Sequence, residues 1–133
     1  MRIDMDKIFD VLEQPGPAAT IELDGKEYQL KQLTVLDVAS YEAVQSPAAG
    51  ETDRQHLDRV LKRYRSMFDG PSLPFLSQPP AEDADEEAAL AYRRRVRALS
   101  TVIGSLIVEW SGNLQARVRA ETTRQIEAAR AIG

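Results

Sequence analysis

The stretch that decides the fold is TIELDGKEYQL, residues 20–30, in which Asp24-Gly25 separates two runs of alternating apolar and polar residues. An Asp-Gly pair between alternating runs is a strong hairpin signal, because a two-residue type I′ turn needs positive φ at both central positions. The apolar positions expected on one face of this hairpin are Ile21, Leu23, Tyr28 and Leu30. Because a lone hairpin is only marginally stable, this face must pack against a helix or another strand.

Three segments around the hairpin have the apolar spacing of amphipathic helices. In residues 4–14, the apolar positions follow i, i+3, i+4 and i+7, the pattern of one helical face. These positions are Met5, Ile8, Phe9 and Leu12. The second and third helices are expected over residues 34–45 and 52–69. Thr34 with Asp37, and Thr52 with Gln55, have the spacing of a capping box at each helix start.

The segment from residue 70 to residue 85 is rich in proline, which excludes a regular helix, and yet it carries Leu73, Phe75 and Leu76. In one interpretation the segment is a loop that crosses the core and buries these three side chains. In the other it is an exposed, extended segment that docks onto a partner. We therefore name Leu73, Phe75 and Leu76 as candidate partner-binding residues.

The last third of the chain is predicted to be helical. Acidic residues at 82–87 suit the start of a helix over residues 84–110, and Glu-to-Arg pairs at i, i+4 with Arg93, Arg94, Arg95 and Arg97 would add stability. Apolar residues recur at steps of 4, 3, 4, 3 and 4, which indicates a seam that packs against another helix, in this chain or in a second copy. The seam consists of Tyr92, Val96, Leu99, Ile103, Leu106 and Trp110.

The end of this seam carries two further expectations. Ser111-Gly112-Asn113 is expected to break the helix, and a final helix should follow over residues 114–131. Trp110, the only tryptophan, is interpreted either as a buried anchor of the core or as an exposed hot spot for association. Because of the second interpretation, we also name Trp110 as a candidate partner-binding residue.

Together these patterns predict an α+β fold that is predominantly α-helical, with a small N-terminal β-hairpin and four to five helices packed around it. The length of 133 residues suits a single domain. Within it, residues 1–45 would hold a helix, the hairpin and a second helix, and residues 46–69 a linker and a helix. Residues 70–85 would form the proline-rich loop, and residues 86–133 the C-terminal helices.

Composition restricts the chemistry. The chain has no cysteine and one histidine, which excludes disulfides and thiolate metal sites, and we expect no catalytic residues, metal or cofactor. His56 is interpreted as a solvated surface residue. The chain has 17 basic and 21 acidic side chains, which give a net charge of −4. Because nucleic-acid affinity depends on attraction to phosphates, the protein is not expected to bind nucleic acid. No secretory signal or membrane-spanning segment is recognisable, so a cytoplasmic protein is expected.

Two groups of basic residues leave an alternative open. One group lies in the third helix and the other in the long C-terminal helix, and their convergence would form a basic patch for nucleic acid. The first group is Arg59, Lys62, Arg63 and Arg65; the second is Arg93, Arg94, Arg95 and Arg97. We expect instead that these side chains are solvated or paired with neighbouring carboxylates, since aromatic residues for base stacking are few.

Residues 20–44, TIELDGKEYQLKQLTVLDVASYEAV, resemble the tail assembly chaperones of long-tailed bacteriophages. In that family a hairpin of the form apolar-x-apolar-DGK-x-Y-x-L is followed by an L-T-x-x-D helix start, which Leu33-Thr34-Val35-Leu36-Asp37 matches. The resemblance covers about a fifth of the chain. Its motif is structural and transfers no functional residue.

This resemblance implies a non-enzymatic helper that binds the tape measure protein, keeps it soluble and recruits tail tube subunits. It also implies a longer, frameshifted form. Two alternatives remain at this point: a structural virion or tail-completion protein that persists in the particle, and a small regulator that contacts nucleic acid through its arginine clusters.

Overall fold

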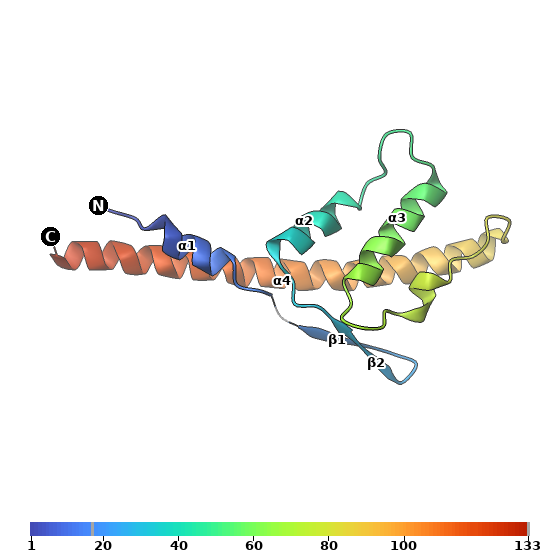
Figure 1. The fold of residues 1–133 in the computed structure, drawn as a ribbon, viewed down its shortest axis with the longest axis horizontal. Coiled ribbons are helices and arrows are strands. Elements are labelled where there is room, and N and C mark those ends of the chain that lie inside the picture. The colour runs from blue at the N-terminus through green and yellow to red at the C-terminus, as the bar shows by residue number, and fades with distance from the viewer. Residues whose placement is uncertain (17, 133) are drawn as a thin grey trace.

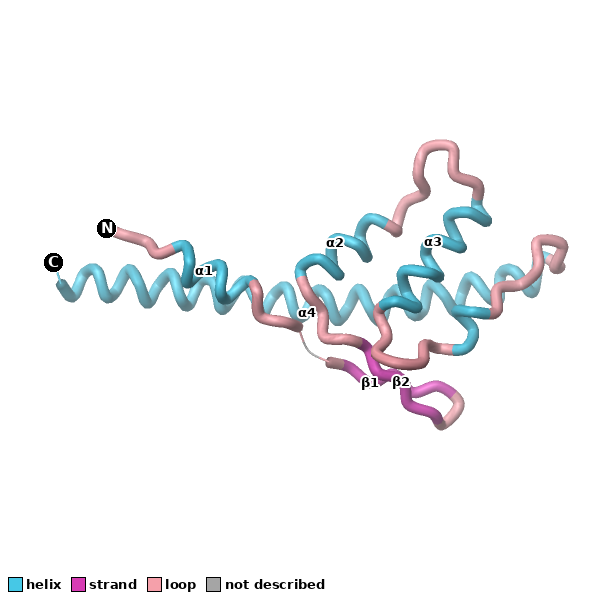
Figure 2. The backbone as a smooth tube through the Cα atoms, viewed as in Figure 1, coloured by secondary structure: helices cyan, strands magenta, loops and turns pink. Residues whose placement is uncertain are grey.

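The computed structural model describes residues 1–16 and 18–132. In this structure the other elements are arranged along one long helix (Figure 1). The elements are α1 (Met5–Leu12), β1 (Ala19–Leu23), β2 (Lys26–Leu30), α2 (Val35–Ala43), α3 (Asp53–Ser66), the 3₁₀ helix η1 (Pro74–Ser77) and α4 (Glu86–Ile132). Long loops join α2 to α3 and η1 to α4 (Figure 2). The described part of the chain is mostly helical with one two-stranded hairpin, which confirms the predicted α+β class.

The hairpin forms where the sequence predicts it. Asp24 and Gly25 have φ values of 52° and 75°, as a type I′ turn requires, and Ile21 pairs with Tyr28 across the antiparallel strands. The outer edge of β2 is held by the segment that follows α3. There the amide of Asp69 donates to the carbonyl of Gln29 at 2.8 Å. The hairpin is thereby fixed to the end of α3.

Both predicted capping boxes are present. At the start of α2, the Asp37 amide donates to the Thr34 hydroxyl at 3.2 Å, and the Thr34 amide donates to the Asp37 carboxylate at 3.0 Å. At the start of α3, Thr52 and Gln55 exchange the same two bonds at 3.1 Å and 2.9 Å. The two helix starts are therefore set by residues three positions apart, independently of distant packing.

The core lies along one stripe of α4, and its period differs from the predicted one. The buried apolar positions on α4 are Tyr92, Val96, Leu99, Ile103, Ile107, Trp110 and Leu114. Ile107 replaces the predicted Leu106, which is only partly buried. A seam with a seven-residue repeat drifts by about 20° per heptad around a straight helix. The observed stripe instead repeats every 11 residues, as at 92, 103 and 114, and so stays on one side of α4.

The predicted break at residues 111–113 is wrong, because α4 runs without interruption from Glu86 to Ile132. A glycine in a helix interior costs only about 1 kcal/mol relative to alanine. Trp110 and Leu114 are both buried against the core, on either side of Gly112. Their burial outweighs the low helix propensity of the glycine.

Candidate protein-binding surfaces

The four predicted partner-binding residues lie in the core or against it. Leu73, Leu76 and Trp110 are 3%, 0% and 4% exposed, and Phe75 is partly buried with its ring edge-on to Tyr92 at 6.2 Å between centroids. The Tyr92 hydroxyl donates to the Phe75 carbonyl at 2.6 Å. The structure therefore corresponds to the interpretation in which residues 70–85 cross the core, and to the anchor interpretation of Trp110. The exposed interpretation is thus not what the structure shows for these four side chains, and their binding to a partner stays a prediction.

An exposed apolar surface lies instead on α1, which the sequence analysis treated only as a packing helix. α1 runs along the C-terminal half of α4, and the two form an arm that extends away from α2, α3 and the hairpin (Figure 1). Ile8 is buried, whereas Met5 and Phe9 are 49% and 50% exposed and Leu12 is 36% exposed. The apolar face of α1 is wider than the area that α4 covers. One side of this apolar face therefore stays in contact with solvent.

A groove adjoins this exposed side. It has a volume of about 310 Å³ and is lined by Leu12 from α1 and by Leu114, Gln115, Val118 and Arg119 from α4. Met5 and Phe9 lie on the same face of α1 as Leu12. We call the groove together with these two side chains the apolar groove. Exposed apolar side chains gathered in one place are typical of a protein-binding surface. The signal was present in the sequence, because Met5, Phe9 and Leu12 share one helical face.

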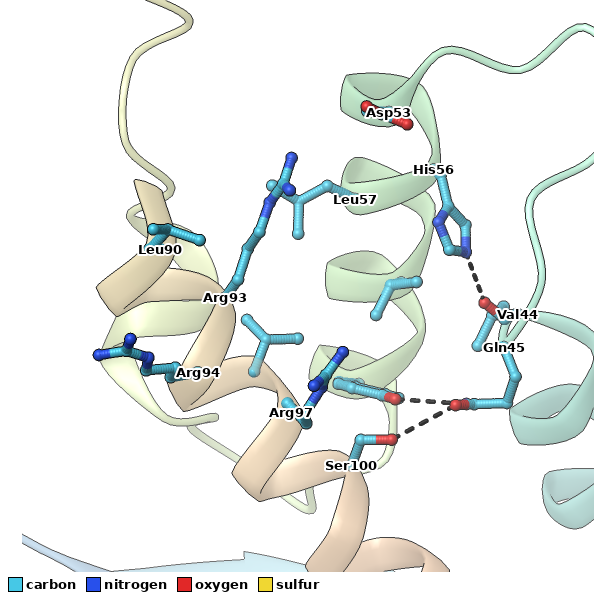
Figure 3. A pocket seen from close by; sticks show the side chains of 13 residues that line it. Val44, Gln45, Asp53, His56, Leu57, Leu90, Arg93, Arg94, Arg97 and Ser100 are labelled. Atoms are coloured by element: carbon cyan, nitrogen blue, oxygen red, sulfur yellow. Dashed lines mark hydrogen bonds between the residues drawn. The ribbon is translucent and has the colours of Figure 1, made fainter. Parts of the chain in front are cut away.

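A second hollow lies between α3 and the N-terminal part of α4 (Figure 3). It has a volume of about 610 Å³, and we call it the arginine cleft. Apolar side chains, including Leu57 and Val60 from α3, form its floor. Arg93, Arg94 and Arg97 line it from α4, and Arg93 and Arg97 extend toward α3 (Figure 3).

The two groups of basic residues differ in whether they form salt bridges. On α3, Arg59 and Arg63 form salt bridges with Glu51 and Asp37 at 2.9 Å and 3.1 Å. The hydrogen bond from Arg59, together with one from the Ala48 amide, lowers the pKa of Glu51 to about 2. These residues therefore hold α3 to its surroundings and form no shared patch with α4.

On α4, by contrast, the predicted Glu-to-Arg pairs are absent from the described residues: none of Arg93, Arg94, Arg95 and Arg97 forms a salt bridge. The reason is spacing. Glu86 and Glu87 precede Arg93 and Arg94 by seven residues, whereas side chains on a helix reach neighbours three or four residues away. The arginines that line the cleft consequently keep their hydrogen-bonding capacity free.

The cleft is also lined by the one histidine of the sequence. His56, expected on the solvated surface, is partly buried, and its Nε2 makes a 2.9 Å hydrogen bond with the Val44 carbonyl, which ties α3 to the end of α2 (Figure 3). The described residues contain no group of three or more histidine, aspartate or glutamate side chains that would hold a metal ion. The cleft thus offers arginine side chains beside apolar surface.

No protein family model matches the chain, and comparisons with curated proteins and with solved structures found no match. Among residues 1–16 and 18–132, no helix is both long enough and apolar enough to cross a membrane.

Proposed function

We propose that the protein is a tail assembly chaperone of a long-tailed bacteriophage, which acts without catalysis. It binds the tape measure protein through the apolar groove and recruits tail tube subunits around this client. The observation that carries the proposal is the exposed apolar side of α1, where Met5 and Phe9 are about half exposed although neighbouring Ile8 is buried. The resemblance of residues 20–44 to these chaperones supports the same function.

The physical basis is the match between an exposed helical stripe and a helical client. A tape measure protein is long and helical, and its apolar stripes aggregate when they are unprotected. Met5, Phe9 and Leu12 lie at i, i+4 and i+7, so they present a line of apolar atoms parallel to the arm. The net charge of −4 would help to keep the resulting complex soluble.

Coexpression with the tape measure protein encoded by the same phage tests this proposal. The double variant Met5→Ser/Phe9→Ser removes the exposed stripe and leaves buried Ile8 in place. We expect the client to remain soluble with the wild-type protein and to precipitate with the variant. The matched control is Val35→Ser/Val102→Ser, which changes two side chains that are 55% and 46% exposed elsewhere. Equal client solubility with both variants would contradict client binding at the apolar groove.

A second candidate function is a structural role in the tail, and the hairpin favours it. The outer edge of β2 is covered by the segment after α3, whereas no strand in the described part of the chain pairs with the outer edge of β1. An open strand edge suits addition to a sheet of a neighbouring subunit. Mass spectrometry of purified virions separates the two functions, because an assembly chaperone should be absent from the finished particle.

A further inference from the structure

The start of α4 has two charged blocks that do not satisfy each other. Acidic residues occupy positions 82–87, the uncharged residues Ala88–Tyr92 follow, and Arg93, Arg94, Arg95 and Arg97 come next. Glu86, Glu87 and the arginines are all exposed, and no salt bridge joins the two blocks. Within one chain the blocks are too far apart along the helix to pair.

The two blocks become complementary when the helix meets a second copy of itself in the antiparallel direction. With Leu90 placed opposite Leu90 of the second copy, position 86 faces position 94, and position 87 faces position 93. Every such contact is a glutamate against an arginine. The charge pattern is therefore self-complementary about Leu90.

We propose that a second copy of this chain docks in the arginine cleft, with the acidic start of its α4 against Arg93 and Arg94. The contact is a twofold antiparallel pairing of the two α4 helices centred on Leu90. This proposal is independent of the function proposed above, which uses the other end of α4.

The geometry supports this occupant. Positions 86, 90, 94 and 97 follow each other at steps of four, four and three, so they lie on one side of α4. Leu90 is 44% exposed and lies on the wall of the cleft beside Arg93 and Arg94, where it would provide an apolar centre (Figure 3). Twofold symmetry then places every glutamate–arginine contact on both sides of that centre.

The charges also specify the direction of the pairing. A parallel alignment in register would set Glu86 against Glu86 and Arg94 against Arg94, and like charges in contact repel. Because all of the charged side chains are exposed, each pair contributes little by itself and is weakened by salt. The structure thus predicts a dimer of modest affinity that dissociates at high ionic strength.

Sedimentation velocity on the full chain tests the proposal. We expect the wild-type protein to populate a dimer at low salt and to become monomeric in about 1 M NaCl, where the screening length is about 3 Å. The variants Arg93→Glu/Arg94→Glu and Glu86→Arg/Glu87→Arg should each be monomeric at low salt. An equimolar mixture of the two should form a heterodimer, because each supplies the charge that the other needs.

The control is Arg95→Glu/Arg130→Glu, which reverses the same number of charges at exposed arginines outside the cleft. It should dimerise like the wild-type protein, and circular dichroism should show that all variants are equally helical. A wild-type protein that is monomeric at low salt overturns the proposal. So does a dimer that survives both charge reversals, or failure of the mixed variants to associate.

Discussion

The side chain of Gln125 forms two hydrogen bonds with the backbone of Asp4, which lies 121 residues earlier in the chain. The Asp4 amide donates to Gln125 Oε1 at 2.6 Å, and Gln125 Nε2 donates to the Asp4 carbonyl at 3.2 Å. Gln125 is the one buried polar side chain in the described part of the protein. It holds the residue that caps α1, and so it fixes the position of the helix that carries the apolar groove.

Replacing Gln125 by leucine should loosen α1 while the rest of the fold persists. The substitution removes both hydrogen bonds, each of which contributes about 0.5 to 1.5 kcal/mol. We expect faster hydrogen exchange at the amides of α1 and unchanged exchange in α3. Thr123→Leu, at an exposed position on the same helix outside the groove, should leave exchange in α1 at the wild-type rate. Equal protection of α1 in both variants would show that this contact does not anchor the arm.

Two glycines of α4 should respond differently to alanine. A Cβ at Gly112 would meet no atom within 4 Å, so Gly112→Ala should stabilise the helix by up to about 1 kcal/mol. A Cβ at Gly104 would lie 3.1 Å from the Tyr41 hydroxyl, which donates to the Ser100 carbonyl at 2.9 Å. Gly104→Ala should therefore gain less or lose stability, because Tyr41 must shift.

Urea unfolding of both alanine variants measures this difference. Adding Tyr41→Phe to Gly104→Ala removes the crowded hydroxyl, and this double change should recover part of the loss relative to Tyr41→Phe alone. A destabilising Gly112→Ala would contradict the continuous course of α4 through residues 111–113.

Leu76 should contribute to stability rather than to partner binding. Its side chain is 0% exposed, so Leu76→Ala should lower the free energy of unfolding by about 2 to 5 kcal/mol. Leu36→Ala, at a position that is 75% exposed, should change it by less than about 0.5 kcal/mol. Thermal and urea melts measure both effects. Wild-type stability of Leu76→Ala would restore the exposed-segment interpretation of residues 70–85.

The Glu51–Arg59 contact should make stability fall in acid. The pKa of Glu51 is lowered from 4.5 to about 2 in the folded protein by its hydrogen bonds with Arg59 and the Ala48 amide. A carboxyl with a lowered pKa in the folded state stabilises the protein above its unfolded pKa. That contribution is lost as the pH falls from about 4.5 toward 2. Glu51→Gln should be less stable at neutral pH and should lose less stability over this interval, as measured by urea midpoints.

Much of the fold is encoded locally and was therefore predictable. Asp24-Gly25 defines the hairpin turn, and the threonines at 34 and 52 define two helix starts, because each signal operates within a few residues. The course of α4 was not predictable in this way. Whether Gly112 breaks the helix depends on the burial of Trp110 and Leu114 by segments distant in sequence.

The candidate surfaces show the same division. The amphipathic pattern of α1 was visible, but which part of its apolar face stays exposed depends on how α4 packs against it. Leu73 and Leu76 have no local pattern that distinguishes a core contact from an exposed motif. For the arginines of α4, the predicted Glu-to-Arg pairs are wrong although the spacing of seven residues could have excluded them, whereas the pairing of Arg63 with Asp37 required the folded structure.

The central position of α4 has a consequence for the way this protein is made. At about 1.5 Å per residue, its 47 residues extend about 70 Å. α1 packs against the C-terminal half of α4, which is the part of this helix that is synthesised last (Figure 1). The nascent chain therefore exposes Ile8 until the C-terminal half of α4 has been synthesised, because α1 finds its packing partner only there.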